Sequence, residues 1–279
     1  MAPLASLDAY LDRIGLAPRE GSARWPGLAE IHRAHATTVP FENFDPYSGT
    51  RVSIDLGDLE SKIVGRRRGG YCFEHNLLLG AALESVGAAV EPMLARVRLG
   101  PEGEGGRPLD HLTLRVTDDA GIWLADVGFG GGGLLDPVPF ELGTETDQSG
   151  WRYRLMKDGR EWVLQVFQDG GWTDMFSFVP EPVPRVDIEV SNWYTATHPT
   201  SSFVNGIMAG LRSVDRCLTL MMFDVTAPLL IERPVGGASS ITPVAPAEVP
   251  SLLRDRFALA GVSRSANGRF VLRESAAQT

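Results

Sequence analysis

The chain has 279 residues, 43% of them hydrophobic and 22% charged, a composition typical of a globular protein with a large core. Its net charge of −9 argues against a general nucleic-acid or membrane-surface binder. No run of about 18 apolar residues predicts a membrane span, and the first residues lack the pattern of a secretory signal. With only two cysteines and no disulfide framework, the chain is expected to be cytoplasmic and reduced.

The first 90 residues show apolar side chains at helical spacing, which predicts a helical region. Four helices are expected, over residues 7–14, 27–38, a stretch that includes 59–63, and 72–87. The side chain of Ser6 is suited to cap the first helix, and Gly15 to end it. Pro40 limits the second helix because the residue before a proline disfavours helical geometry.

From about residue 90 the pattern changes to the alternation typical of β-strands. Strands are predicted at residues 90–99, 112–116 and 122–127, with a Gly/Pro/Glu-rich loop over 100–108. The pairs Asp158-Gly159 and Asp169-Gly170 each separate two β-like runs, which is a strong hairpin signal. Residues 90 to about 190 are therefore expected to form an antiparallel sheet or small barrel. The last third is mixed, with strands predicted at 216–223 and 227–231 and a helix at 249–260.

Cys72 is the leading candidate for a reactive side chain. It lies in residues 67–76, RRGGYCFEHN, where two glycines end a loop and a helical pattern begins. A helix N-terminus and nearby arginines both favour thiolate over thiol. A free cysteine is also commonly a small buried core residue. Cys217 lies in an apolar strand-like run and is expected to be inert.

A reactive cysteine needs a base, and the base needs an orienting group. His111 opens a predicted strand, and the next strand ends at Asp126. If these strands pair about a turn at 118–121, His111 lies opposite residue 126, 127 or 128, within about 8 Å of the carboxylate even as a diagonal neighbour. The Asp126 carboxylate would then hold the imidazole, and imidazolium beside Cys72 would favour the thiolate.

The remaining histidines are weaker candidates. His75 follows Cys72 by three residues but has no carboxylate partner, so we interpret it as a neighbour or substrate-facing residue. His32 and His35 have no third ligand nearby and are interpreted as packing residues, and His198 as a helix-end residue. A zinc site is disfavoured because the spacing contains no paired ligand motif.

These residues lie in segments that together resemble the arylamine N-acetyltransferases, of the bacterial type. Residues 67–76 are similar to the signature of that family. Further similar segments follow in order, namely residues 11–15 (LDRIG), 39–43 (VPFEN), 111–112 (HL), 126–130 (DVGFG) and 191–203. The resemblance covers most of residues 7–205.

The resemblance implies an α+β fold with a cysteine-protease-like catalytic core. A helical domain (1–90) would carry the nucleophile, an antiparallel β-barrel domain (91–195) the histidine and aspartate, and an α/β lid domain (196–279) would complete the chain. It also implies a catalytic triad at Cys72, His111 and Asp126, the residues chosen above from chemistry.

The implied reaction is a two-step transfer from acetyl-CoA, through an acetyl-cysteine, to an arylamine or hydrazine, with no metal, nucleic acid or membrane. Backbone amides at the helix start, including that of Cys72, are candidates for the oxyanion site. Substrate-binding candidates are aromatic or flexible residues that could wall an acceptor pocket, namely Phe41, Phe129, Gly130 and Phe203. Arginines 66–68 could steer CoA phosphates, lower the thiol pKa or pair with Glu42, and the resemblance favours such a structural pair, with Arg67 and Arg68 as candidates.

Two other enzyme classes use similar groups. A papain-like or transglutaminase-like hydrolase would act through the same triad without acetyl-CoA. An amide synthase that closes a polyketide macrolactam remains an alternative within the family. A non-enzymatic binding protein is disfavoured, since binding alone does not need all three groups.

Overall fold

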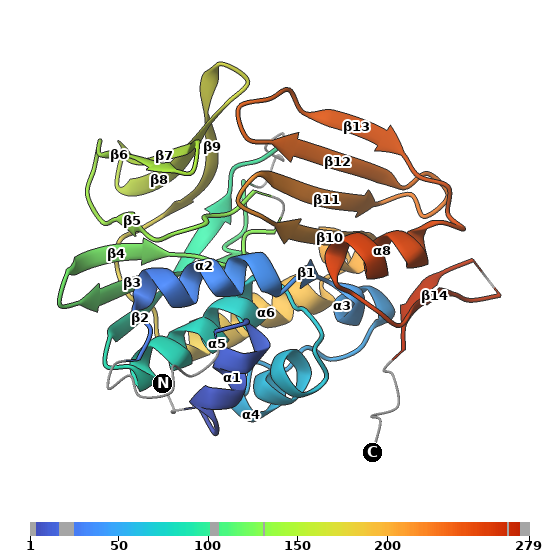
Figure 1. The fold of residues 1–279 in the computed structure, drawn as a ribbon, viewed down its shortest axis with the longest axis horizontal. Coiled ribbons are helices and arrows are strands. Elements are labelled where there is room, and N and C mark those ends of the chain that lie inside the picture. The colour runs from blue at the N-terminus through green and yellow to red at the C-terminus, as the bar shows by residue number, and fades with distance from the viewer. Residues whose placement is uncertain (1–3, 17–24, 101–105, 131, 267, 274–279) are drawn as a thin grey trace.

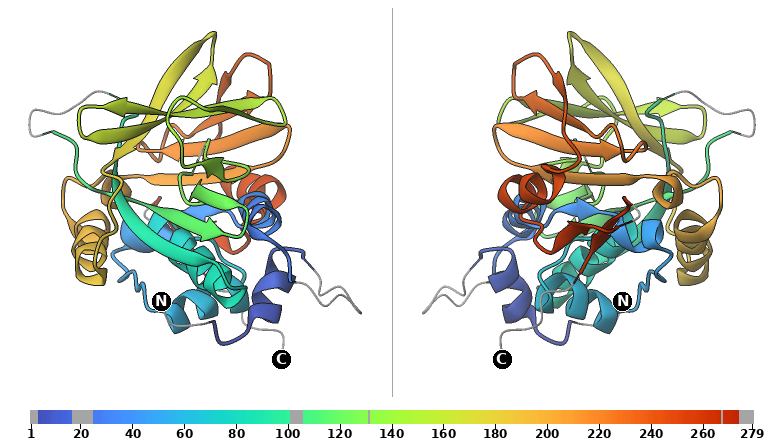
Figure 2. Two further views of the ribbon diagram at one scale, coloured as in Figure 1. Left: turned by 90° about the vertical axis from the view of Figure 1, so that its left-hand side faces the viewer. Right: turned by 90° about the vertical axis from the view of Figure 1, so that its right-hand side faces the viewer.

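The fold is described by a computed structural model that covers residues 4–16, 25–100, 106–130, 132–266 and 268–273 (Figure 1). Residues 101–105 of the predicted loop at 100–108 lie outside this description. Helices gather at one end of the molecule and two antiparallel sheets at the other, an arrangement also seen in both side views (Figure 2). The α+β fold class predicted from the sequence is confirmed.

The helical region contains α1 (Leu7–Arg13), α2 (Leu28–Thr38), α3 (Phe44–Ser48), α4 (Leu56–Leu59), the π-helix η1 (Glu60–Gly65) and α5 (Cys72–Ser85). The Ser6 side chain caps α1 by accepting a hydrogen bond from the N–H of Ala9. The predicted third helix is present as α4 followed directly by η1. Helix α5 is buried on all sides from Cys72 to Leu83, so it forms the centre of the first hydrophobic core.

The larger sheet has eight strands in the order β5-β4-β3-β2-β9-β8-β7-β6. Its strands are β2 (Ala89–Val97), β3 (His111–Asp118), β4 (Gly121–Ala125), β5 (Val138–Pro139), β6 (Glu145–Gln148), β7 (Trp151–Asp158), β8 (Glu161–Gln168) and β9 (Gly171–Phe178). Both predicted hairpins are present. At the second, Asp169 and Gly170 have φ values of 50° and 82°, as a type I′ turn requires.

The second sheet joins the helical region to the last third of the chain. Its order is β1-β10-β11-β12-β13, formed by β1 (Phe41–Glu42), β10 (Ile207–Arg212), β11 (Arg216–Met222), β12 (Leu229–Pro234) and β13 (Ser240–Pro243). Helix α8 (Val249–Phe257) packs on β10, and β14 (Val262–Arg264) pairs with β15 (Phe270–Leu272). Because Phe41 pairs with Gly210, the strand that follows α2 is held by the C-terminal sheet.

The region from residue 179 to 195 differs from the sheet expected there. The larger sheet ends at Phe178, and the chain continues into helix α6 (Arg185–Thr197) and the short α7 (Ser202–Asn205). In α6 the apolar side chains of Val186, Val190 and Trp193 are exposed, whereas polar side chains such as Asn192 and Thr195 are buried. This reversed polarity hides the helical period from a hydrophobicity pattern.

Three hydrophobic cores hold these parts together. One surrounds α5, one fills the barrel-like sheet around Tyr153 and Phe176, and one lies between the C-terminal sheet and α8 around Phe257. Within the described ranges, every helix is too short or too polar to cross a membrane.

Candidate active site

Cys72 is the first residue of α5, and its side chain is buried against the start of β3. The thiol donates to the carbonyl oxygen of Asp110 at 3.6 Å, and the N–H of Leu112 and the His111 side chain also hydrogen-bond to the sulfur. Gly128 closes the other side, since a Cβ there would lie 2.6 Å from the Cα of Cys72. The thiol is therefore enclosed by backbone from two separate segments.

A buried ion network fixes the loop before Cys72. Arg68 contacts Glu42 and Asp45, each at 2.8 Å, and Lys62 contacts Asp45 at 2.7 Å and Glu74 at 2.6 Å. The second carboxylate oxygen of Glu74 accepts from the N–H of Tyr71 and completes the capping of α5. The network thereby connects the start of α5 with η1 and with the segment after β1.

The two arginines proposed as structural support lie in different surroundings. Arg68 is buried with Glu42, whereas the Arg67 side chain is 63% exposed and faces Asp12 at 4.0 Å. None of the arginines at 66–68 is among the groups that act most strongly on the pKa of Cys72. The charge next to the thiol comes from His111 instead.

His111 and Asp126 meet as diagonal neighbours of one hairpin. Strands β3 and β4 pair with Leu114 opposite Ala125, and continuing this register places His111 opposite Gly128. Side chains two residues apart point to the same face, so that of Asp126 projects toward the ring. The His111 Nε2 donates to Asp126 Oδ2 at 2.5 Å, and both side chains are buried.

Asp126 is held from several sides. Its Oδ1 accepts from the Asn76 side chain at 3.0 Å and from the N–H of Gly128 at 2.9 Å. Asn76 also donates to the carbonyl of Leu112 at 2.6 Å and accepts from the N–H of Val127. Asn76 is absent from the candidates chosen from the sequence, although its position one helical turn after Cys72 places it on the same side of α5.

These contacts define the ionisation of the site. Although burial opposes the charged form, the Asp126 carboxylate raises the pKa of His111 to about 10. Burial would raise the pKa of Asp126, but the charge of His111 and its hydrogen bonds lower it. Burial raises the pKa of the Cys72 thiol, and the hydrogen bond and charge of His111 oppose that rise. His111 is therefore the group through which a thiolate at Cys72 is stabilised.

The aromatic candidates gather beside this triad. Phe41, Phe129 and Gly130 line one small cavity together with Leu211, from the C-terminal sheet. The Phe129 ring lies 5.4 Å from the His111 ring, and the Phe203 ring lies 5.9 Å from that of Phe41. Phe203 therefore packs against Phe41 but does not line that cavity. Gly130 has a φ of +80°, a conformation that favours glycine.

His75 belongs to a buried chain of hydrogen bonds rather than to a substrate-facing surface. Tyr10 donates to His35 Nδ1 at 2.7 Å, His35 Nε2 to His75 Nδ1 at 2.8 Å, and His75 Nε2 to the carbonyl of Pro40 at 3.2 Å. Burial lowers the pKa of His75 to about 4, so its ring is neutral at physiological pH. In this chain of hydrogen bonds each ring donates from one nitrogen and accepts at the other, which only a neutral imidazole can do.

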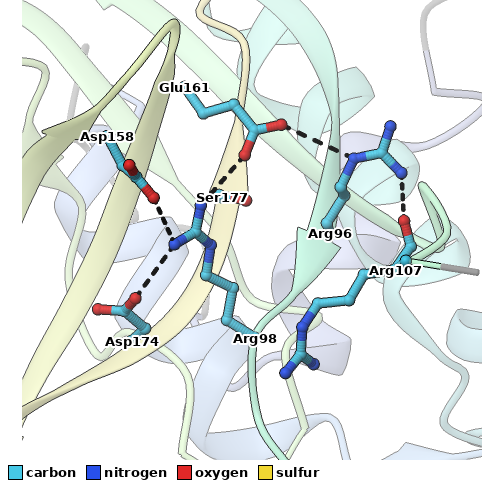
Figure 3. Close-up of a pocket in the computed structure, with 8 residues that line it drawn as sticks. Arg96, Arg98, Arg107, Asp158, Glu161, Asp174 and Ser177 are labelled. Atoms are coloured by element: carbon cyan, nitrogen blue, oxygen red, sulfur yellow. Dashed lines mark hydrogen bonds and ion pairs between the residues drawn. The ribbon is translucent and has the colours of Figure 1, made fainter. Parts of the chain in front are cut away.

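A larger cavity of about 670 Å³ lies beside the barrel, at the segment leading to β3 (Figure 3). Its wall contains three guanidinium and three carboxylate groups, those of Arg96, Arg98, Arg107, Asp158, Glu161 and Asp174. Arg98 contacts all three carboxylates at distances of 2.8 to 3.3 Å. The opposite charges are balanced, and their ion pairs connect residues of strands β2, β7, β8 and β9.

No group of three or more histidine, cysteine, aspartate or glutamate residues suited to a metal ion occurs in the part of the chain that the structure describes. Of the four side chains that could hold zinc by composition, Cys72, His111 and Asp126 are bonded to one another and to the backbone, and His75 is bonded to His35 and Pro40.

Comparison with known proteins gives a consistent result. A family model described as N-acetyltransferase matches residues 26–264. The arylamine N-acetyltransferase of Mycolicibacterium smegmatis is 39% identical over 216 residues, which cover 75% of this chain and 77% of that protein. The arylamine N-acetyltransferase of Mycobacterium bovis is 36% identical over 259 residues, covering 91% and 89%.

Solved structures show the same likeness. The structure of Mycobacterium marinum arylamine N-acetyltransferase in complex with CoA has a TM-score of 0.82 and 35% identity, and the match covers 91% of this chain and 92% of that one. The likeness thus extends over sequence, fold and length, and this chain belongs to the arylamine N-acetyltransferase family of acyltransferases.

Proposed function

We propose that the protein transfers an acetyl group from acetyl-CoA to an aromatic amine or hydrazine through a thioester at Cys72. The observation that carries this proposal is the buried Cys72–His111–Asp126 arrangement, in which His111 Nε2 is bonded to Asp126 at 2.5 Å while the ring hydrogen-bonds to the thiol. This geometry supports the nucleophile, base and orienting group that acyl transfer requires.

In the first step the Cys72 sulfur attacks the thioester carbonyl of acetyl-CoA, and the carbonyl oxygen becomes an oxyanion. We assign the N–H of Cys72, at the start of α5, as one donor to that oxyanion. The tetrahedral intermediate collapses, the bond to CoA sulfur breaks, and protonated His111 gives its proton to the departing thiolate. Exchange of one thioester for another is nearly balanced in energy, which suits a cysteine nucleophile.

In the second step the acceptor nitrogen attacks the acetyl-cysteine and His111 removes its proton. Asp126 stabilises the imidazolium at both stages. General-base assistance of this kind typically contributes about 10²–10⁴ in rate. The product amide leaves, and the Cys72 thiolate is regenerated beside protonated His111.

The acceptor is proposed to bind beside Phe129. This ring packs edge-on against His111, and Phe41 and Gly130 form the facing wall of the same cavity. The cavity itself, of about 20 Å³, is too small for an aromatic ring, so the proposal rests on the flat apolar face of Phe129 next to the base, against which an aromatic amine or hydrazine would pack.

Intact-mass measurement tests the proposal. We expect acetyl-CoA to add one acetyl group to Cys72, with release of CoA, and an arylamine or hydrazine to remove it. Cys72→Ala should abolish the adduct, and Cys217→Ala is the matched control because Cys217, on β11, is equally buried but bonds to Arg212 rather than to a member of the triad. Failure to form an adduct on Cys72 contradicts the proposal. An adduct lost equally fast without any amine identifies a hydrolase instead.

A further inference from the structure

His32 is a buried histidine on α2 with contacts that differ from those of the other histidines. Its Nε2 accepts a hydrogen bond of 3.0 Å from the backbone N–H of Asp126, and its Nδ1 donates to the carbonyl of Leu135 at 2.9 Å. The side chain is fully enclosed. Both ring nitrogens are therefore bonded, and each bond goes to the segment that follows β4.

The two partners of His32 delimit that segment. Asp126 is its first residue, and Phe129 and Gly130, which line the cavity beside the triad, lie between Asp126 and Leu135. The adjacent residue of α2, Arg33, pairs with Asp136, its Nε contacting Oδ1 at 2.7 Å. Helix α2 thus contacts both ends of the segment, in addition to the contact that Asn76 on α5 makes with Asp126.

We propose that His32 is a positioning residue for the catalytic triad, which holds the backbone of Asp126 so that its carboxylate meets His111 in the productive geometry. The consequence of this assignment for acetyl transfer rests on the proposed function. The effect of His32 on the Cys72 thiol can be measured without any acetyl donor.

The physical reason is the short reach of an aspartate side chain. The carboxylate lies two bonds from its own backbone, so a shift of the Asp126 N–H moves the oxygen that accepts from His111. Loss of the acceptor at His32 also leaves a buried N–H without a partner, which the segment relieves by moving. Weaker contact with Asp126 lowers the proton affinity of His111, and the thiolate at Cys72 loses its counter-charge.

His32 must be neutral to accept this bond. Burial lowers its pKa, while Leu135 and the carboxylates of Asp136 and Asp126 act in the opposite direction. The ring is therefore an acceptor at the pH values at which the thiolate forms.

Three substitutions at this position separate the two bonds. His32→Leu removes both. In His32→Gln the side-chain oxygen reaches the place of Nε2 and restores the acceptor for Asp126, whereas His32→Asn restores only the donor toward Leu135. His35→Leu is the matched control, because His35 is three residues away on α2 and equally buried, but bonds to Tyr10 and His75.

The measurement is the pH dependence of Cys72 alkylation by iodoacetamide, followed by intact mass on protein verified as folded by near-UV circular dichroism. We expect His32→Leu and His32→Asn to raise the midpoint by about one pH unit, which corresponds to roughly tenfold less thiolate at neutral pH. His32→Gln should remain near the parent protein, and His35→Leu should leave the midpoint unchanged even if it lowers the melting temperature.

A midpoint unchanged in His32→Asn overturns the assignment, as does an equal shift in His35→Leu. If His32→Leu does not fold, the comparison of His32→Gln with His32→Asn still tests whether the acceptor for the Asp126 N–H sets the alkylation midpoint. Because alkylation needs no acetyl-CoA, a parent protein that fails to accept acetyl contradicts the proposed function and leaves this test intact.

Discussion

Gly128 shows how a single residue constrains the site. A methyl group there would lie 2.6 Å from the Cα of Cys72 and 2.9 Å from the side chain of Asn76, and the first of these neighbours is backbone. Its N–H also donates to Asp126. The glycine is therefore required by close approach rather than by flexibility, because the start of α5 and the segment after β4 must nearly touch for the triad to assemble.

The raised pKa of His111 predicts a pH-dependent contribution to stability. Its folded value of about 10 lies above the usual value of 6.5, so the contribution is complete below about pH 6.5 and is lost as the pH rises toward 10. In a Cys72→Ala background, which removes the thiol titration, His111→Gln should therefore reduce the free energy of unfolding most at pH 6. Urea denaturation from pH 6 to 10 measures this, and a difference that stays constant would contradict it.

At the scale of the element, the start of α5 depends on charges supplied by other elements. Lys62 of η1 contacts Asp45 and Glu74, and all three side chains are largely enclosed. Removing one member of such a network leaves unpaired buried charge, which typically destabilises by about 3–5 kcal/mol.

Lys62→Met is accordingly expected to lower the free energy of unfolding by about 3 kcal/mol, since the buried Glu74 carboxylate loses its cation and Asp45 loses one of its two. The chain contains only one other lysine, Lys157, which is exposed on β7, and Lys157→Met is the control expected to change little. Equilibrium urea denaturation compares the two variants. Equal losses in both would contradict the assigned role of Lys62.

Helices and strands could be predicted from the sequence where the spacing of apolar side chains matches the side chains that the fold buries. Helices α1, α2 and α5 and the two Asp-Gly hairpins satisfy this condition. Helix α6 does not, because it exposes Trp193 and buries Asn192. The π-helical geometry of η1 also escapes prediction, since a pattern with Leu59 and Ile63 four residues apart equally fits an α-helix.

At the scale of the whole molecule, a buried arginine joins the two sheets. Arg212 of β10 donates to the Tyr153 hydroxyl of β7 at 2.8 Å and stacks over the Trp151 ring at 4.5 Å. Tyr153 in turn donates to the carbonyl of Gly133 at 3.1 Å. The contact links the C-terminal sheet to the barrel and to the glycine-rich segment that follows Asp126.

Tyr153→Phe is expected to lower the free energy of unfolding by about 1–3 kcal/mol, because the guanidinium of Arg212 loses a buried partner while the ring remains. Tyr194→Phe, at a partly exposed position on α6, is the control and should change little. Urea denaturation provides the measurement, and an unchanged Tyr153→Phe variant would show that the hydroxyl contributes nothing to this junction.

Among the contacts of the site, the one that strand pairing predicts is the contact between His111 and Asp126, which lie in one hairpin. His111 and Asp126 are separated by a short turn, so strand pairing alone brings them together. His32 and Asn76 contact Asp126 from α2 and α5, and of the ion network only the pairing of Glu42 with an arginine was expected, through the family resemblance. Such long-range contacts leave no periodic signal in the sequence, and a polar residue within a helix gives no indication of what it binds.

The division of the triad between α5 and the β3–β4 hairpin has a consequence for biosynthesis. Cys72 emerges from the ribosome before the hairpin that carries His111 and Asp126 exists, and a cysteine without them is an ordinary, mostly protonated thiol. The nucleophile is thus created by docking of the hairpin rather than by translation of its residue. An incomplete or misfolded chain therefore carries a cysteine without its base, and the ability of Cys72 to accept an acetyl group reports that this core is complete.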